Sequence, residues 1–355
     1  MSSRVSSETS DTSDTSARSR TNRESSSLAA TSQASSCSHM SPGKLSSVAR
    51  FGLLLLGSLF LSSLLYSPTL GIMMWDLSFV SKHLDEWWQV AGLVAWKGLE
   101  LGLAWLLKFD GRDMAFFILL THAPTFFLLF YFYRIRPTTV ITSFAIDIIS
   151  MTVPFMLLRR PNAVHSLSNS SSRPVSNRSI LQDRPTAIYT SVAASSTFAV
   201  LLYISFSTWL PVFLVTHFDG IPDITATHAG PAGLPTMFFS LLPAGYAARD
   251  LLFLNSAGWS PEPESSGAKP SSNSNKYLVT SLYRRTWGRL GAKTRILLLR
   301  TIALASMMVL NTIVRVWGTI EGVDIVGATG WGSIWAVAAL VIGLTFGWIE
   351  AVDGV

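Results

Sequence analysis

The chain is poor in charged residues and almost free of cysteine. Only 14% of its 355 residues are charged, whereas soluble proteins carry about 25%. The single cysteine, Cys37, excludes an intrachain disulfide framework. It also excludes a zinc site of the usual several-cysteine kind. These deficits remove the disulfide-rich secreted class and argue against a soluble domain.

Motifs that would identify an enzyme or a nucleic-acid binder are missing as well. The sequence contains no nucleophile elbow, dinucleotide fingerprint, phosphate loop or paired metal motif. A formal net charge of +6 would favour nucleic acid as the partner of a soluble chain. Here the basic residues lie beside apolar segments, where topology and anionic headgroups explain them. We therefore expect a lipid bilayer as partner, with anionic lipids as candidates. We expect neither nucleic acid nor a cofactor, and the sequence does not identify protein partners.

Long apolar stretches make up most of the remainder, since 49% of the residues are hydrophobic and 12 are tryptophan. A helix of about 21 residues spans the roughly 30 Å of bilayer hydrocarbon. The sequence predicts an all-α integral membrane protein, a polytopic bundle of about eight transmembrane helices, with seven or nine as the nearest alternatives. The expected spans are 50–66, 87–107, 113–133, 137–158, 187–216, 234–254, 295–317 and 328–350.

Polar segments divide the chain. Residues 1–47 are dominated by Ser and Thr and contain almost nothing that could form a core, which predicts a disordered cytosolic tail. We expect a first four-helix membrane half at 48–158, a cytosolic polar linker at 159–187 and a second four-helix half at 188–355. The second half includes a cytosolic polar loop at 255–293.

The distribution of basic residues predicts the orientation. With the amino terminus in the cytosol, 21 of the 27 Lys and Arg residues fall on the cytosolic side and four on the opposite side. This asymmetry follows the positive-inside rule and places both termini in the cytosol. The first span has no evident cleavage pattern and is interpreted as a retained signal anchor. We expect the endoplasmic reticulum or another endomembrane as the location.

Four ionisable residues interrupt three consecutive spans near their middles. Lys97 and Glu100 are three residues apart and share one helix face, while His122 and Asp147 lie at similar depth on the next two spans. Such groups are costly in lipid unless they meet each other or water. The hypothesis is one cluster in which Lys97 is shared between Glu100 and Asp147 and His122 relays protons. The alternative is a structural salt bridge that fixes helix register.

A second polar group follows in the last spans. Headgroup contact is one interpretation of its arginines, and snorkelling toward the interface is the other. Residues 277–290 have the pattern of an interfacial amphipathic helix. The group comprises Arg249, Asp250, Arg300, Asn311 and Arg315, and the candidate anionic headgroup contacts are Arg249, Arg300, Arg284, Arg285 and Arg289. His217, Asp219, Asp223 and His228 have metal-ligand side chains without a metal-motif spacing, so we assign no metal.

Three functions fit these patterns. The first is binding or translocation of a small solute or proton through the four-residue cluster, which requires a water-accessible cavity beside it. The second is a non-catalytic membrane scaffold or assembly factor, in which the charges are sealed and mutually paired. The third is an intramembrane lipid-modifying enzyme, which needs a lateral opening beside the carboxylates; without a nucleophile or metal, the sequence leans against catalysis.

Overall fold

The computed structural model describes residues 47–83, 85–159, 183–228, 230–257 and 291–353. Every regular element in these ranges is helical, apart from two isolated bridges that join loops. The expected all-α fold class is therefore confirmed. The predicted amino-terminal tail, most of the central linker and the amphipathic segment 277–290 lie outside the described residues.

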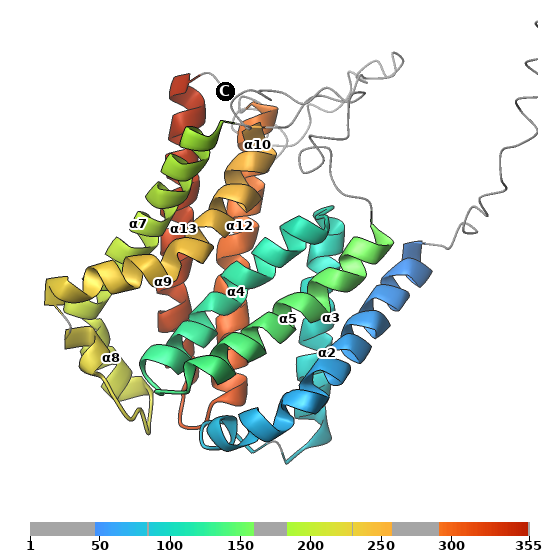
Figure 1. Ribbon diagram of the computed structural model, residues 1–355, viewed down its shortest axis with the longest axis vertical. Helices are drawn as coiled ribbons and strands as arrows, with labels where there is room; N and C mark the ends of the chain where they lie inside the picture. Colours follow the sequence, from blue (N-terminus) through green and yellow to red (C-terminus); the bar gives the residue numbers. More distant parts are fainter. Residues whose placement is uncertain (1–46, 84, 160–182, 229, 258–290, 354–355) are drawn as a thin grey trace, which may run out of the picture. The chain divides into compact units, whose positions relative to one another are not determined.

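Long helices alternate in direction along the chain (Figure 1). Among the described residues, seven helical segments are long and apolar enough to cross a membrane. The helix α3 is the eighth long helix, with 20 residues, but Gln89, Lys97 and Glu100 lower its mean hydropathy. The helices are α2 (Ser47–Ser78), α3 (Trp87–Leu106), α4 (Gly111–Tyr131), α5 (Pro137–Leu158), α7 (Arg184–Ser207), α8 (Leu210–His217), α9 (Gly233–Ala248), α10 (Asn255–Ala257), α12 (Ala292–Thr312) and α13 (Ile325–Asp353).

Two π-helical segments continue α-helices without a break. The segment η3 (Arg249–Leu254) follows α9, and η5 (Ile313–Trp317) follows α12. A π-helix has a wider turn than an α-helix, so it changes the direction of the side chains that it carries. Both segments carry arginines from the second predicted polar group.

The predicted span 187–216 is wrong as a single helix. The helix α7 ends at Ser207, and α8 begins at Leu210 with Pro211 in its first turn. Proline lacks a backbone N–H and disfavours helical backbone in the residue before it, so it is better placed at the start of a new helix than inside a long one. The apolar composition of 187–216 concealed this break.

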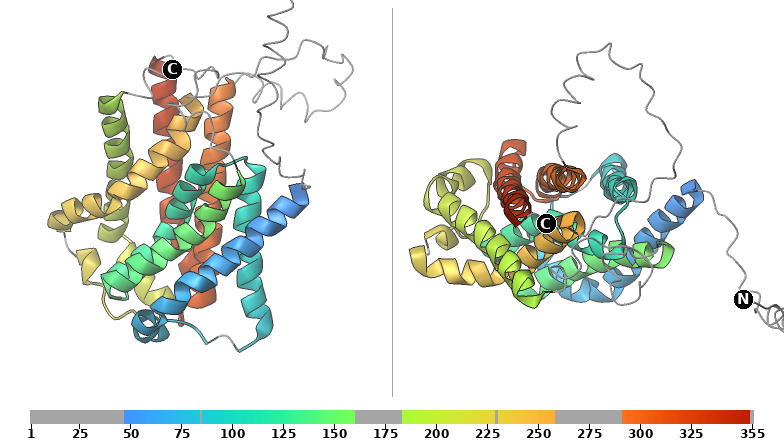
Figure 2. Two further views of the ribbon diagram at one scale, coloured as in Figure 1. Left: turned by 45° about the vertical axis from the view of Figure 1, so that its right-hand side comes forward. Right: turned by 90° about the horizontal axis from the view of Figure 1, so that it is seen from above.

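The two predicted membrane halves share one core. The pairs α4–α5, α7–α9 and α12–α13 pack closely, and α4 also packs against α12 and α9 (Figure 2). Trp331 of α13 is fully buried and donates a hydrogen bond from Nε1 to the carbonyl of Pro124 in α4, at 2.8 Å. The helix α4 is thus the central element that joins the first half to the second.

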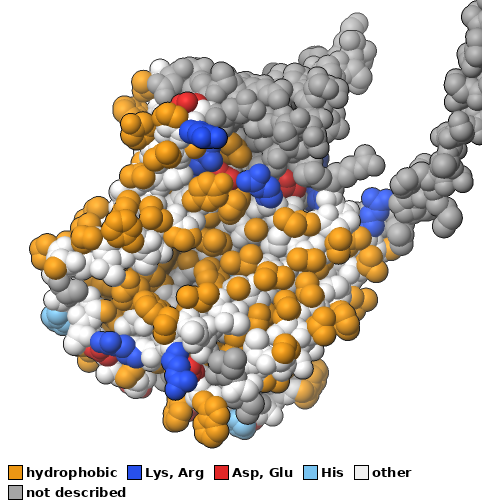
Figure 3. All heavy atoms as spheres, viewed as in Figure 1, with side chains coloured by type: hydrophobic (Ala, Val, Ile, Leu, Met, Phe, Trp, Pro, Cys, Tyr) orange, Lys and Arg blue, Asp and Glu red, His pale blue; other side chains and the backbone are white. Residues whose placement is uncertain are grey.

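The outer surface of the bundle is apolar. Large side chains such as Leu56, Phe60 and Leu344 are 67%, 71% and 72% exposed. On the face drawn in Figure 3, hydrophobic side chains cover the middle and charged ones gather toward the two ends. An apolar surface of this extent is unusual for a water-soluble monomer and suits contact with lipid.

Close packing of α7 against α9 depends on the absence of a side chain at Gly245. A Cβ at this position would lie 2.6 Å from the amide nitrogen of Ser195 and 2.7 Å from the carbonyl of Ser191. We expect Gly245→Ala to destabilise the bundle by about 1–3 kcal/mol, because the α7 backbone must move. Gly52→Ala is the control, since no atom lies within 4 Å of its Cβ position. An unchanged thermal midpoint of Gly245→Ala in detergent would contradict the α7–α9 contact.

Candidate functional site

The first predicted cluster forms around His122, near the middle of α4. Its Nε2 lies 3.1 Å from Oε1 of Glu100 on α3, and its Nδ1 lies 3.3 Å from Oδ2 of Asp147 on α5. His122 and Glu100 are fully buried, and Asp147 is 7% exposed. The structure thus brings three of the four predicted residues into a continuous chain of contacts across three helices.

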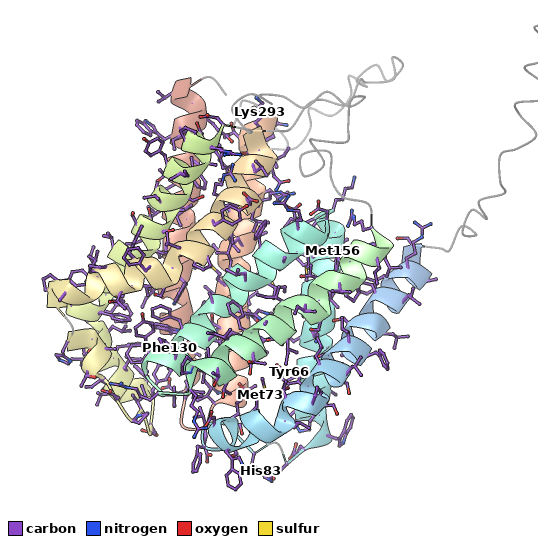
Figure 4. The ribbon with its side chains drawn as sticks, in the orientation of Figure 1. Tyr66, Met73, His83, Phe130, Met156 and Lys293 are labelled. Carbon is purple, nitrogen blue, oxygen red and sulfur yellow. The ribbon has the colours of Figure 1, made fainter. Side chains whose placement is uncertain are left out.

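Asp147 has two further partners. Arg315 donates from Nη1 to Oδ2 of Asp147 at 2.7 Å, and the hydroxyl of Tyr66 donates to Oδ1 at 3.4 Å. Tyr66 belongs to α2 and lies on the side that faces α5 (Figure 4). The sequence placed Arg315 in the second polar group and did not single out Tyr66. Arg315 lies on the π-helical η5, whose altered register could not be read from the residues.

Lys97 does not occupy the predicted place between the two carboxylates. Its described hydrogen bond goes from Nζ to Oγ of Ser150, at 3.5 Å. Among the described ion pairs, Asp147 contacts His122 and Arg315, and Glu100 contacts His122. Arg315 therefore supplies the cation that we expected from Lys97. Its guanidinium is planar and always charged, which suits a buried ion pair better than an ammonium group.

The two contacts of His122 restrict the protons in the cluster. Ionised carboxylates only accept hydrogen bonds, and a neutral imidazole has one donor nitrogen. His122 can therefore donate to both Glu100 and Asp147 only when both ring nitrogens carry hydrogen; otherwise one carboxyl must be protonated. When both ring nitrogens carry hydrogen, the negative charges of Glu100 and Asp147 are balanced by the imidazolium of His122 and the guanidinium of Arg315. Lys97 is not included in this balance.

The cluster does not open into any of three surface cavities in the described part of the chain. None of these cavities is lined by Glu100, His122, Asp147 or Arg315. One acceptor, Oε2 of Glu100, is buried without a hydrogen-bond partner in the described part of the chain. The described contacts pair Glu100, His122, Asp147 and Arg315 with one another, and of these side chains that of Arg315 is the most exposed, at 24%. This arrangement can fix the relative register of α2, α3, α4, α5 and η5.

A second ionic network lies nearer the helix ends that lead into the predicted cytosolic segments. Arg300 of α12 pairs with Asp113 of α4 at 3.2 Å, and Asn255 donates to the same carboxylate at 2.7 Å. Asp250 of η3 pairs with Arg249 at 2.6 Å and with Arg112 at 3.3 Å. The network joins α4, η3, α10 and α12.

Two of the predicted headgroup contacts, Arg249 and Arg300, belong to this network. The side chains of Arg249 and Arg300 are only 9% and 10% exposed, and both bind protein carboxylates. Snorkelling therefore does not describe these two arginines. The other candidate headgroup contacts, Arg284, Arg285 and Arg289, lie outside the described residues. Asp113 and Asn255 were missed because the sequence placed them at boundaries between an apolar span and a polar segment. In the structure, Asp110 caps α4 by accepting a hydrogen bond from the Asp113 amide at 2.8 Å.

Asn311 joins neither polar network. Its Nδ2 donates to the carbonyl of Thr121 at 2.9 Å, and its Oδ1 accepts from Nε1 of Trp96 at 3.0 Å. It therefore makes hydrogen bonds between helices, as expected for a polar side chain in a membrane bundle.

Two of the loop residues with metal-ligand side chains, His217 and Asp223, form ion pairs within the protein. His217 contacts Asp324 at 2.9 Å, and Arg134 donates from Nε to Asp223 at 2.6 Å. Hydrogen bonds from the side chain and backbone of Thr225 hold the pKa of Asp223 at about 2, and the Gly327 amide lowers the pKa of Asp324. In the described ranges, no group of three or more His, Cys, Asp or Glu side chains is arranged to hold a metal.

Removing one member of the Asp147–Arg315 pair leaves the other buried charge without its partner. We expect Arg315→Met to lower stability by about 3–5 kcal/mol, and Asp147→Leu combined with Arg315→Met to recover most of the loss. Arg136→Met is the matched control, since this side chain is 75% exposed and lies 3.6 Å from Asp76; it should cost about 0–1 kcal/mol. Unfolding in detergent measures all three variants. A double variant as unstable as Arg315→Met would contradict the pairing.

The second half of the chain is similar to a known protein family. Residues 183–349 match a family model described as the Bouquet formation protein 3 C-terminal domain. The match runs from the start of α7 into α13 and covers slightly less than half of the chain. It includes Arg315 but not Glu100, His122 or Asp147. No curated protein and no solved structure matches the chain.

Proposed function

We propose that this protein is a non-catalytic membrane scaffold, in which the buried polar cluster holds the helices in one arrangement. The observation that carries this proposal is the closed state of the cluster. Glu100 and His122 are fully buried, and Asp147 is satisfied by Arg315, His122 and Tyr66. Charges that are already paired inside a bundle have little free capacity for a transported ion.

The family similarity supports the same proposal. The matching model is named for bouquet formation, and its name mentions neither an enzymatic activity nor transport. Because the match covers 183–349 alone, it bears on the half of the chain that contains α7 to α13. The polar cluster adds an independent argument, because all of its members except Arg315 lie in the other half.

Translocation of a solute or proton and lipid modification have weaker support. Translocation needs alternating water access to the cluster, and lipid modification needs a lateral opening beside a carboxylate. The cavity of about 410 Å³ on the α3 surface is lined by Trp88, Trp96 and Trp317, not by cluster residues. No described observation favours transport over a structural role for the charges.

Energetics clarify what a structural cluster contributes. Polar contacts between membrane helices are worth only about 0.6 kcal/mol each on average. A misplaced helix, however, would leave a charge unpaired in a medium of low dielectric constant, at a cost of several kcal/mol. The cluster therefore penalises wrong helix arrangements more than it strengthens the correct one, which is a useful property in a scaffold.

Proton flux tests this proposal against its main alternative. We expect vesicles that contain the wild-type protein to dissipate an imposed pH gradient no faster than protein-free vesicles, because the cluster is sealed. Asp147→Asn and Lys97→Met should then leave the rate unchanged. A pH-sensitive dye inside the vesicles provides the measurement.

The opposite outcome is equally clear. Wild-type flux that is abolished by Asp147→Asn in folded protein, and retained by Arg136→Met, would replace the scaffold function with translocation. Folding of each variant is checked by its thermal midpoint before reconstitution.

A further inference from the structure

A second feature of the protein lies where α2, α4, α7–α8 and α12 lead into loops at one end of the bundle. A cavity of about 550 Å³ is formed there by four chain segments. Phe79 comes from the segment after α2, Tyr133 from the turn after α4, and Asp219 and Glu321 from the loops before α9 and α13. His83, labelled in Figure 4, marks the same end of the bundle.

Backbone pairing fixes the shape of this cavity. The segment around Glu321 is bridged to Ser81 on one side, through Ile320, and to Phe218 on the other, through Val323. The amide of Glu321 donates to the carbonyl of Val80 at 3.0 Å, and the amide of Asp219 donates to the carbonyl of Gly322 at 2.7 Å.

Gly322 permits this close approach. Its φ of +75° lies in the left-handed region, and a Cβ there would lie 2.6 Å from the carbonyl of Asp219. Only glycine adopts this conformation without strain in such a crowded place. Asp219 and Glu321 are therefore held on adjoining backbones, before any partner binds.

The other acidic side chains at this end are mostly engaged. Four of these carboxylates form ion pairs with arginine or histidine side chains. By contrast, Asp219 and Glu321 are exposed and have no ion-pair partner among the described residues. Lys82 lies nearby, but its ammonium is placed 5.9 Å over the ring of Trp317. The engaged pairs are Arg134–Asp223, Arg136–Asp76, His217–Asp324 and His83–Asp85.

Tyr133 adds a hydrogen-bonding group to the cavity wall. It is 9% exposed, and its hydroxyl has no hydrogen-bond partner in the described part of the chain. Burial raises the pKa of Tyr133 to about 12, so the phenol stays neutral at physiological pH. A buried hydroxyl without a partner costs free energy that a bound donor or acceptor would recover. Phe79, 85% exposed, offers an aromatic face at the rim of the same cavity.

We propose that this cavity binds an arginine or lysine side chain of a partner protein on this side of the membrane. Two carboxylates accept charge-assisted hydrogen bonds from a guanidinium or ammonium group, and aromatic faces attract the same cations. The Tyr133 oxygen accepts a further N–H. The choline group of a lipid fits less well, because it has no N–H to donate. The proposal names a partner chemistry for the scaffold and so rests on the proposed function.

Small cations test the recognition directly. Ethylguanidinium and tetramethylammonium are titrated separately against the full chain in a maltoside detergent, which carries no choline, and binding is followed by saturation-transfer NMR. We expect ethylguanidinium to bind and tetramethylammonium to bind more weakly. The double variant Asp219→Asn/Glu321→Gln should weaken ethylguanidinium binding about tenfold or more.

The matched control is Asp85→Asn/Glu86→Gln, which removes the same charge from exposed positions that do not line the cavity. It should retain ethylguanidinium binding. The proposal is overturned by absent binding, by equal loss in both double variants, or by an unaffected Asp219→Asn/Glu321→Gln protein. Equally strong binding of tetramethylammonium would assign the cavity to a choline headgroup instead. Neither variant touches the buried cluster, so failure here leaves the scaffold function standing.

Discussion

The ion pair between Asp147 and Arg315 is the contact on which the arrangement of α5 and α12 depends. It joins α5 to the π-helical end of α12 at 2.7 Å, and His122 extends it to Glu100 on α3. In a bilayer, a carboxylate at this depth has no water to replace a lost partner. The helices are therefore held together by a requirement for charge compensation as well as by packing.

The central helix α4 connects this constraint with the rest of the fold. It carries His122 at its middle, Asp113 in its first turn and the carbonyl of Pro124 that accepts from Trp331. One ionic network thus lies near the middle of α4 and another at its start, while its aromatic side chains pack against α13. A scaffold benefits from such a rigid centre, because its loops can then present fixed surfaces such as the cavity beside Asp219.

The sequence predicted the features that depend on the free energy of transferring side chains from water into lipid. Long apolar runs predicted an all-α membrane bundle, and the charges inside those runs singled out Lys97, Glu100, His122 and Asp147. The partner of Asp147 could not be predicted, because it depends on a π-helical register that no residue pattern marks. The break before Pro211 was hidden by apolar residues on both sides, and Asp113 looked like a turn residue until its helix was placed beside Arg300.

Water access to the cluster tests the central claim most directly. Ser150 is fully buried beside Lys97, whereas Ser81 is exposed in a loop. In a Cys37→Ser background, Ser150→Cys and Ser81→Cys can be reacted with a small charged thiol reagent in native membranes. A sealed cluster predicts rapid labelling of Ser81→Cys and labelling of Ser150→Cys only after denaturation. Comparable labelling rates in the folded protein would contradict it.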